Sequence, residues 1–252
     1  MTMLVDFLCR FGFGLALGLV LTPAGLVPPG FFRVNLLVVM GLGTFAALLA
    51  HGALPGTTWL FPALAATVAW MGSVLWLAHR KTAGLVACGL AGLAMAVGAW
   101  GAAAVVPGGG AHGGWGVMPT ALRSLLSGAV IGLTVHAMLL GHWYLNAPGM
   151  SVEALRRVID VALVAWLTQV VVSVADWQMA AATGGASSVS ATVSALLSLR
   201  WLAGLAGLPV LLWMSRKTLD IPNTQSATGI LYVACLAAIV GELAGQLLAA
   251  SG

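Results

Sequence analysis

Charge is what this chain has least of. Only 6% of its 252 residues are Asp, Glu, Lys or Arg, whereas a soluble domain carries about 25%. This low charge, together with 61% hydrophobic residues, excludes a water-soluble globular protein. It also excludes intrinsic disorder, which needs high charge and low hydrophobicity. We therefore expect residues 1–252 to form a single integral membrane domain.

Cysteine is also scarce. Cys9, Cys88 and Cys235 lie far apart and lack a C-x-x-C spacing, so they cannot by themselves hold zinc or an iron–sulfur cluster, and we predict no metal site. The ten Lys and Arg residues form no basic patch with interleaved aromatics, which argues against a nucleic-acid partner. Their excess over the six Asp and Glu residues is instead typical of the cytoplasmic loops of a membrane protein.

Long apolar runs make up most of the sequence. A helix needs about 20 apolar residues to cross a hydrocarbon layer about 30 Å thick. The sequence therefore predicts an all-α membrane protein with eight transmembrane helices and with membrane lipids as neighbours. The predicted helices are 4–22, 34–51, 59–78, 83–105, 121–145, 158–179, 193–214 and 227–248.

The basic residues between these helices indicate an orientation. They fall on one side of the membrane when the chain is threaded through eight helices: Arg33, Arg80, Lys81, Arg156, Arg157, Arg216 and Lys217. Because cytoplasmic loops are enriched in Lys and Arg, we expect both termini to lie outside.

Short sequence matches indicate a possible internal repeat of residues 1–120 and 121–252. Val-Ala-Cys recurs at 86–88 and 233–235, and Arg-Lys-Thr recurs at 80–82 and 216–218. Because each half has an even number of predicted helices, the halves would share one topology and be related by an axis along the membrane normal. The expected architecture is two four-helix bundles side by side.

Several titratable residues lie at one depth within the predicted helices. At 1.5 Å per residue, His51, Asp176 and Arg200 lie about 24–28 Å from the inner belt of basic residues, and Glu242 lies at a similar height. A charge at the centre of a membrane helix costs at least about 2.5–3.5 kcal/mol, so each needs a partner, water or a function.

Helical spacing groups polar residues around two of these acids. Gln169, Ser173 and Asp176 follow one stripe of their helix, and Glu242 and Gln246 are four residues apart. One interpretation is a site for a polar-headed, lipid-soluble ligand or a proton path. The other is that Arg200 pairs with Asp176 or Glu242 only to fix helix packing.

Three segments carry a family resemblance. His51-Gly-Ala-Leu-Pro55 closes the second predicted helix, Leu-Ser-Leu-Arg200-Trp201 lies in the seventh, and Gly241-Glu242-Leu-Ala-Gly245-Gln246 lies in the eighth. This series resembles DmsC, the eight-helix membrane anchor of dimethyl-sulfoxide reductase, and the wider NrfD/polysulfide-reductase group of quinone-interacting subunits. The long stretch 218–229 between the last two predicted helices departs from that pattern.

The resemblance implies a fold and a function. It implies two four-helix bundles with outward termini, in a bacterial inner membrane. It implies that the chain binds a quinone, either menaquinone or ubiquinone, near the periplasmic face. It also implies that an iron–sulfur or cytochrome partner subunit exchanges electrons with that quinone, in a respiratory-type oxidoreductase complex.

The resemblance also implies roles for particular residues. His51 and Glu242 would handle protons, and Arg200 would line the quinone. Asp176, chosen for its depth alone, is a third proton-handling candidate. Two further residues are expected to contact the quinone: Gln246 and Trp177.

Two other functions and one other cofactor compete with this interpretation. A proton- or ion-coupled transporter would suit repeated four-helix units with internal charges. A purely structural membrane anchor would use close helix contacts such as Gly241–Gly245. Haem b needs two histidines that face one site, and His136 and His142, six residues apart, lie about 120° apart around a helix. Haem is therefore not expected.

Overall fold

The structure is a computed structural model that describes residues 1–105, 117–147, 149–182, 191–221 and 223–251. Within these ranges, eight helical spans are long and apolar enough to cross a membrane, so the chain is a multi-pass helical membrane protein. The helices are α1 (Thr2–Leu21), α2 (Pro29–Ala53), α3 (Leu60–Leu77), α4 (Lys81–Ala103), α5 (Val117–Asn146), α6 (Glu153–Ala182), α7 (Ala191–Leu199), the π-helical segment η1 (Arg200–Gly207), α8 (Leu208–Thr218) and α9 (Thr224–Ser251).

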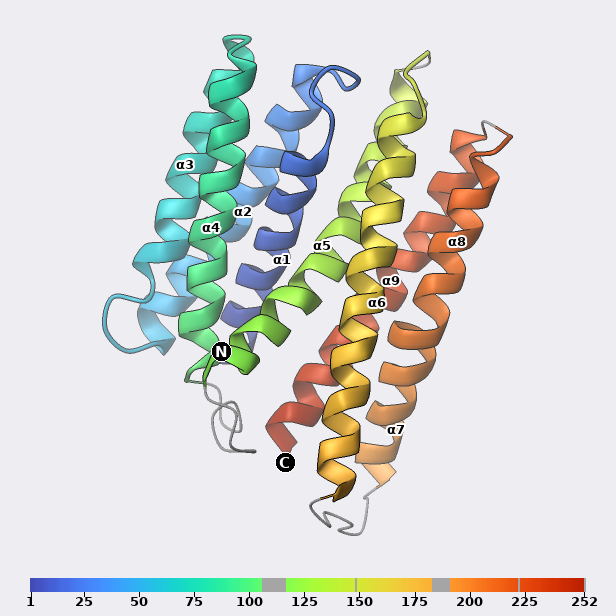
Figure 1. Ribbon diagram of the computed structural model, residues 1–252. Coiled ribbons are helices and arrows are strands. Elements are labelled where there is room, and N and C mark those ends of the chain that lie inside the picture. Colours follow the sequence, from blue (N-terminus) through green and yellow to red (C-terminus); the bar gives the residue numbers. More distant parts are fainter. Residues whose placement is uncertain (106–116, 148, 183–190, 222, 252) are drawn as a thin grey trace.

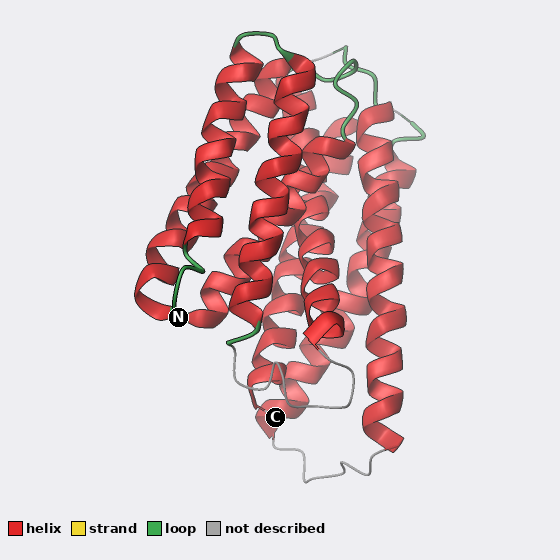
Figure 2. Ribbon diagram, turned by 60° about the vertical axis from the view of Figure 1, so that its left-hand side comes forward, coloured by secondary structure: helices red, strands yellow, loops and turns green. Residues whose placement is uncertain are grey.

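The helices pack as two groups that meet along α1 and α5. Helices α1 to α4 pack mainly on one another, α5 packs on α6 and α9, and α1 packs on α5. Both termini lie at the same end of the molecule (Figure 1). Among the described residues the regular structure is helical, joined by turns (Figure 2).

Several helices begin earlier than the sequence predicts. Helix α2 begins at Pro29 rather than at residue 34, with Pro28 at its N-cap, because proline is favoured in the first helical turn. Helix α6 begins at Glu153 rather than at residue 158. Arg33, Arg156 and Arg157 therefore lie in the first turns of helices and not in loops, which corrects their predicted position.

The last two spans also differ from the prediction. The seventh span, Ala191–Thr218, is not one uniform α-helix, because η1 interrupts it between α7 and α8. The expected long stretch 218–229 is mostly helical, since α9 already begins at Thr224. The Asn223 Oδ1 atom accepts the backbone N–H of Ser226 at 3.0 Å, which is an N-cap interaction.

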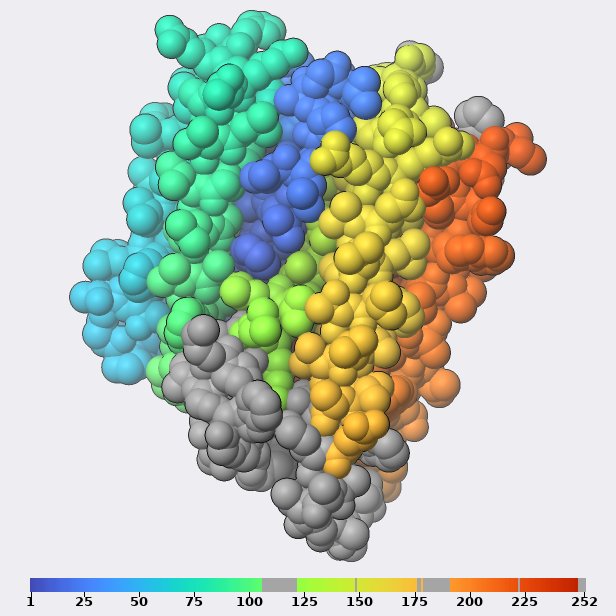
Figure 3. All heavy atoms as spheres, in the orientation of Figure 1, coloured from blue at the N-terminus to red at the C-terminus, as the bar shows by residue number. Residues whose placement is uncertain are grey.

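Helix α5 occupies the centre of the molecule. In the most apolar 18-residue stretch of α5, 72% is buried inside the structure. The corresponding share is 17% for both α6 and the seventh span, Ala191–Thr218. In the space-filling view α6 runs along the outside, next to α8 (Figure 3). Most side chains in these two apolar stretches therefore face outward, where lipid would surround them.

Glycines set the contact between α1 and α5. A Cβ atom on Gly14 would overlap the backbone of Gly128 and Gly132, and one on Gly132 would overlap the backbone of Gly14. Small residues spaced in this way let membrane helices approach closely and pack without a hydrophobic driving force. This crossing brings the two groups of helices together one turn away from Arg10.

Replacing Gly132 with Ala should destabilise this crossing. Overpacking costs about 1–3 kcal/mol, and a protein of this size loses about 2–4 °C of melting temperature for each kcal/mol. We expect Gly132→Ala to lower the thermal midpoint in detergent by roughly 5 °C. The control is Gly41→Ala, where an added Cβ meets nothing within 4 Å. Equal midpoints for the two variants would contradict this packing.

Impermeant thiol labelling tests the predicted orientation. The three native cysteines are buried and should react slowly, so new surface cysteines can be read against them. With both termini outside, Thr57→Cys in the α2–α3 turn should label on intact cells, and Asn146→Cys at the opposite end of α5 should label only after permeabilisation. The reverse pattern would overturn the orientation.

Candidate functional site

Arg10 is the centre of a buried cluster of charges. Asp6 and Arg10 lie one turn apart on α1, and the guanidinium group binds the carboxylate through two nitrogens. Arg10 Nε lies 2.8 Å from Asp6 Oδ1, and Nη2 lies 2.5 Å from Oδ2. This bidentate geometry is the strongest form of an arginine–carboxylate pair.

The same guanidinium group reaches across to the second group of helices. Its Nη1 atom donates to Glu242 Oε1 on α9 at 2.8 Å. Ser127 on α5 donates its hydroxyl to the same oxygen, also at 2.8 Å. Arg10 therefore joins α1 to α9, with a side chain of α5 beside the joint.

Neutral side chains complete the coordination of Asp6. Ser124 on α5 donates to Asp6 Oδ1 and Gln246 on α9 donates to Oδ2, each at 3.4 Å. Asp6 is only 2% exposed and Glu242 only 7%. Because a buried charge is tolerated only when it is paired and hydrogen-bonded, Arg10 and these donors allow the two carboxylates to lie inside the bundle.

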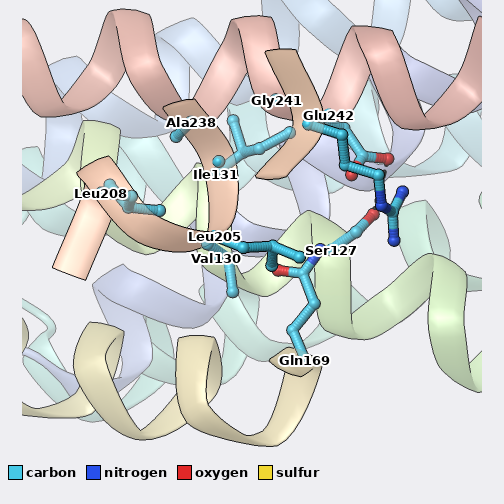
Figure 4. Close-up of a pocket in the computed structure, with 11 residues that line it drawn as sticks. Ser127, Val130, Ile131, Gln169, Leu205, Leu208, Ala238, Gly241 and Glu242 are labelled. Carbon is cyan, nitrogen blue, oxygen red and sulfur yellow. Dashed lines mark hydrogen bonds between the residues drawn. The ribbon is translucent and has the colours of Figure 1, made fainter. Parts of the chain in front are cut away.

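A small cleft adjoins Glu242 inside the second group of helices (Figure 4). Its volume is about 20 Å³, and a water molecule needs roughly 10–15 Å³. In Figure 4 Ser127, Gln169 and Glu242 lie around its polar side, and apolar residues of α5, η1 and α9 line the rest. The cleft as it stands therefore has room for water and is polar enough to hold it.

Arg200 is the second arginine of the site. It lines the cleft together with Glu242, and its Nη2 atom donates to Ser173 on α6 at 3.1 Å. A Cβ atom on Gly245 would overlap the Arg200 guanidinium group, so that glycine leaves the space which the guanidinium group occupies. One turn away, Gly204 of η1 packs against the backbone of Gly241.

The structure brings together several of the predicted site residues. Arg200 and Glu242 line one cleft. Gln246 donates to Asp6, which shares the Arg10 guanidinium group with Glu242. Gln169 and Ser173, two members of the predicted stripe on α6, face this site. The close helix contact expected at Gly241 and Gly245 is also present, because both glycines pack against residues of η1.

Other predicted residues lie elsewhere or are not described. His51 is exposed near the end of α2, and its ring packs edge-on against Trp59, with ring centroids 5.3 Å apart. It makes none of the hydrogen bonds of the Arg10 cluster given above. Asp176 and Trp177 lie within α6, but their side chains lie outside the described part of the structure.

Arg10, the residue at the centre of the site, was not among the predicted site residues. Asp6 and Arg10 carried no predicted role, although an acid and a base four residues apart in an apolar helix indicate a buried pair. The partnership with Glu242, 232 residues further along the chain, has no comparable sequence signal. The Arg200–Ser173 hydrogen bond fits both interpretations of Arg200, a residue that fixes helix packing and a residue that lines a ligand site.

The two histidines of α5 have different surroundings. His136 is buried, with its Nε2 atom 2.7 Å from Thr22 Oγ1. His142 is exposed, with its Nδ1 atom 3.2 Å from the Tyr232 hydroxyl. The predicted angular separation of these side chains agrees with one lying inside the bundle and the other outside.

The fold and the cluster define a multi-pass membrane protein with an ionic site inside its helix bundle. Comparisons with protein-family models, with curated proteins and with solved structures find no match for the chain.

Removing Arg10 should be much more harmful than neutralising the whole cluster. Arg10→Met leaves two buried carboxylates without their cation, which costs about 3–5 kcal/mol. The triple variant Asp6→Asn, Arg10→Met and Glu242→Gln should recover most of that loss, because no buried charge remains unpaired. Thermal unfolding in detergent measures both.

The matched control is Lys217→Met. Lys217 pairs with Asp220 at 3.5 Å on the exposed surface, where such pairs contribute about 0–1 kcal/mol. If Arg10→Met were no more destabilising than Lys217→Met, the charge cluster would not be buried as described.

Proposed function

We propose that this chain is the membrane subunit of a quinone-linked oxidoreductase and that it binds the quinone or quinol head group in the cleft beside Glu242. The supporting observation is that this cleft gathers an acid, a guanidinium group, a hydroxyl and an amide inside an apolar helix bundle. Ionisable residues within the membrane are expensive and usually mark ligand or proton pathways. The resemblance to the DmsC and NrfD group points to the same ligand.

The chemistry of a quinone suits these side chains. Its two carbonyl oxygens accept hydrogen bonds, and its two-electron reduction takes up two protons. Arg200 can donate to an oxygen that gains negative charge, because donors preset in a site of low polarity stabilise such charge best. Glu242 can exchange a proton, and Arg10 and Ser127 hold its carboxylate in place.

Proton exchange at Glu242 is coupled to the rest of the cluster. A carboxylate that is protonated no longer balances the Arg10 charge, so Asp6 alone would then hold the guanidinium group. The bidentate contact to Asp6 leaves Arg10 with a partner in either state. Glu242 can therefore take up and release one proton without leaving the buried Arg10 guanidinium group unpaired.

The cleft must widen to admit a quinone. Ligand pockets are usually about 300–1,000 Å³, and this cleft is far smaller. Gln169 of α6 and several residues of the seventh span contribute to its lining. Only 17% of the most apolar 18-residue stretch of each of these two spans is buried. Because these two spans are the least buried of the eight, the ligand would enter between them from the lipid side.

Several further features belong to the proposal. The quinone would be menaquinone or ubiquinone, and an iron–sulfur or cytochrome subunit would take or supply the electrons, since the sequence has no motif for a redox centre of its own. The membrane would be the bacterial inner membrane, with the site near its outer face. The halves 1–120 and 121–252 would be two four-helix bundles.

The resemblance implies that His51 handles protons, but its position in the structure does not support that role. Its side chain is exposed on α2 and contacts Trp59, whereas Glu242 and Arg10 already provide a carboxylate and a cation beside the cleft. We therefore assign proton exchange to Glu242.

One observation favours a second candidate, a proton- or ion-coupled transporter. The Arg10–Glu242 pair joins the two groups of helices, and breaking and remaking such a pair could accompany movement of one group against the other. A transporter in liposomes would move protons down an imposed gradient without quinone. A quinone-binding subunit would not.

Binding of a tritiated short-chain quinone to the purified protein tests the main proposal. Wild type should bind it saturably, and both Glu242→Gln and Ser127→Ala should weaken binding on the order of tenfold, because each removes a partner in a buried polar network. Thr44→Ala, at an exposed position of α2, should leave it unchanged. Binding that does not saturate, or that is equal in every variant, would overturn the proposal.

His51→Ala locates the site in the same assay. Unchanged affinity supports the cleft beside Glu242, whereas loss of binding with normal affinity in Glu242→Gln would move the site to the end of α2.

A further inference from the structure

The π-helical segment has a cause that can be read from the sequence. In an α-helix the Leu205 carbonyl would accept the backbone N–H of residue 209, but that residue is Pro209, which has none. The backbone instead widens, so that the N–H of Leu208 donates to the carbonyl of Ala203, five residues back. This bond pattern defines a π-helix, which often occurs at functional sites.

A tryptophan of α6 donates a hydrogen bond to the Leu205 carbonyl, which cannot accept one from Pro209. Trp166 Nε1 donates to the Leu205 carbonyl at 3.1 Å. A buried carbonyl without a donor would cost free energy comparable to a lost hydrogen bond, so Pro209 and Trp166 form a matched pair. One removes the donor and the other replaces it from the neighbouring helix.

The π segment determines which residues face the cleft. A π turn adds one residue relative to an α-helix, which rotates everything before it by about 100° with respect to α8. In the observed register Arg200, Gly204 and Leu205 all line the cleft. The same register places Gly204 against Gly241 and the Arg200 guanidinium group over Gly245.

The contacts from α6 match this register. Trp166, Gln169 and Ser173 lie on one stripe of α6. Trp166 binds the Leu205 carbonyl, Gln169 lines the cleft, and Ser173 accepts from Arg200. Two hydrogen bonds therefore hold η1 against α6, one near each end of the segment.

We infer that Trp166 and Pro209 are positioning residues, which hold the π segment in the register that aims Arg200 into the cleft. Neither side chain supplies the chemistry. Trp166 acts through the Leu205 carbonyl, and Pro209 acts by withholding a backbone donor. The consequence for ligand binding depends on the proposed quinone function, whereas the consequence for helix register does not.

Quinone binding in a double-mutant cycle tests the ligand half of this inference. Trp166→Phe keeps an aromatic ring but loses the N–H group, and it should weaken binding of the tritiated quinone on the order of tenfold. Pro209→Ala should weaken it as well, because residue 209 can then donate to Leu205 and the turn reverts to an α-helix. In the Pro209→Ala background Trp166→Phe should have no further effect, since the carbonyl no longer needs the indole. Trp70→Phe, on an exposed face of α3, is the matched control.

Additive losses in the double variant would overturn the coupling between Trp166 and Pro209. Unchanged binding in Trp166→Phe would overturn its positioning role, and this single variant also decides the matter if Pro209→Ala does not fold. A partial rescue of Trp166→Phe by Trp166→His, which restores a ring N–H, would support it.

A stability cycle tests the register without any ligand. Gly204→Ala should lower the thermal midpoint in wild type, because its Cβ meets the Gly241 backbone at 3.0 Å. In the Pro209→Ala background residue 204 turns away from Gly241, so the same substitution should cost less. An equal loss in both backgrounds would overturn the inference even if wild type binds quinone. If wild type does not bind quinone, the proposed function fails and this cycle still decides the register.

Discussion

A guanidinium group inside a membrane-embedded bundle needs its charge balanced by protein groups, because lipid hydrocarbon offers neither counter-charge nor hydrogen bonds. Arg10 meets this requirement through Asp6 on its own helix and through Glu242 on the last helix of the chain. Gly14 and Gly132 let α1 and α5 approach at the backbone, one turn away from Arg10. The close helix crossing and the ionic joint are thus two parts of one constraint, which fixes how the two groups of helices meet.

The cleft follows from a second close contact. Gly204 and Gly241 bring η1 against α9, and Gly245 leaves room for the Arg200 guanidinium group. The π segment, caused by Pro209 and held by Trp166, keeps Arg200 on the side that faces Glu242. Two arginines therefore lie near the Glu242 carboxylate. Arg10 forms a tight ion pair with it, and Arg200 lies on the π-helical segment that lines the same cleft.

Much of the fold could be predicted from the sequence, and its exceptions have physical reasons. Apolar length predicts the spans, which the described helices confirm to within a few residues at most ends. The ends near Arg33 and Arg156 were misplaced because long basic side chains can lie within a helix and still reach the surface. The π segment was missed, although Pro209 within an apolar run was a visible signal for it.

The site was only partly predictable for a similar reason. The four-residue spacing of Glu242 and Gln246 and the depth of Arg200 could be read from the sequence, and the spacing of Asp6 and Arg10 carried the same kind of information. Which acid meets which base is a property of helix packing, set by Gly14, Gly132 and Gly241, and local spacing does not encode it. His51 was predicted from its depth, but its side chain is exposed on α2 against Trp59, because depth along a helix does not fix the direction of a side chain.

The central claim is that the cleft beside Glu242 is where the membrane-soluble ligand binds, and photoaffinity labelling tests it most directly. The purified protein in lipid nanodiscs is irradiated with an azido-quinone, and the labelled residues are identified by mass spectrometry. The account predicts labels on residues that line the cleft, such as Gln169, Leu205 and Ala238, and their loss when unlabelled quinone competes. Labels spread over the exposed faces of α3 and α4, and unaffected by competitor, would contradict it.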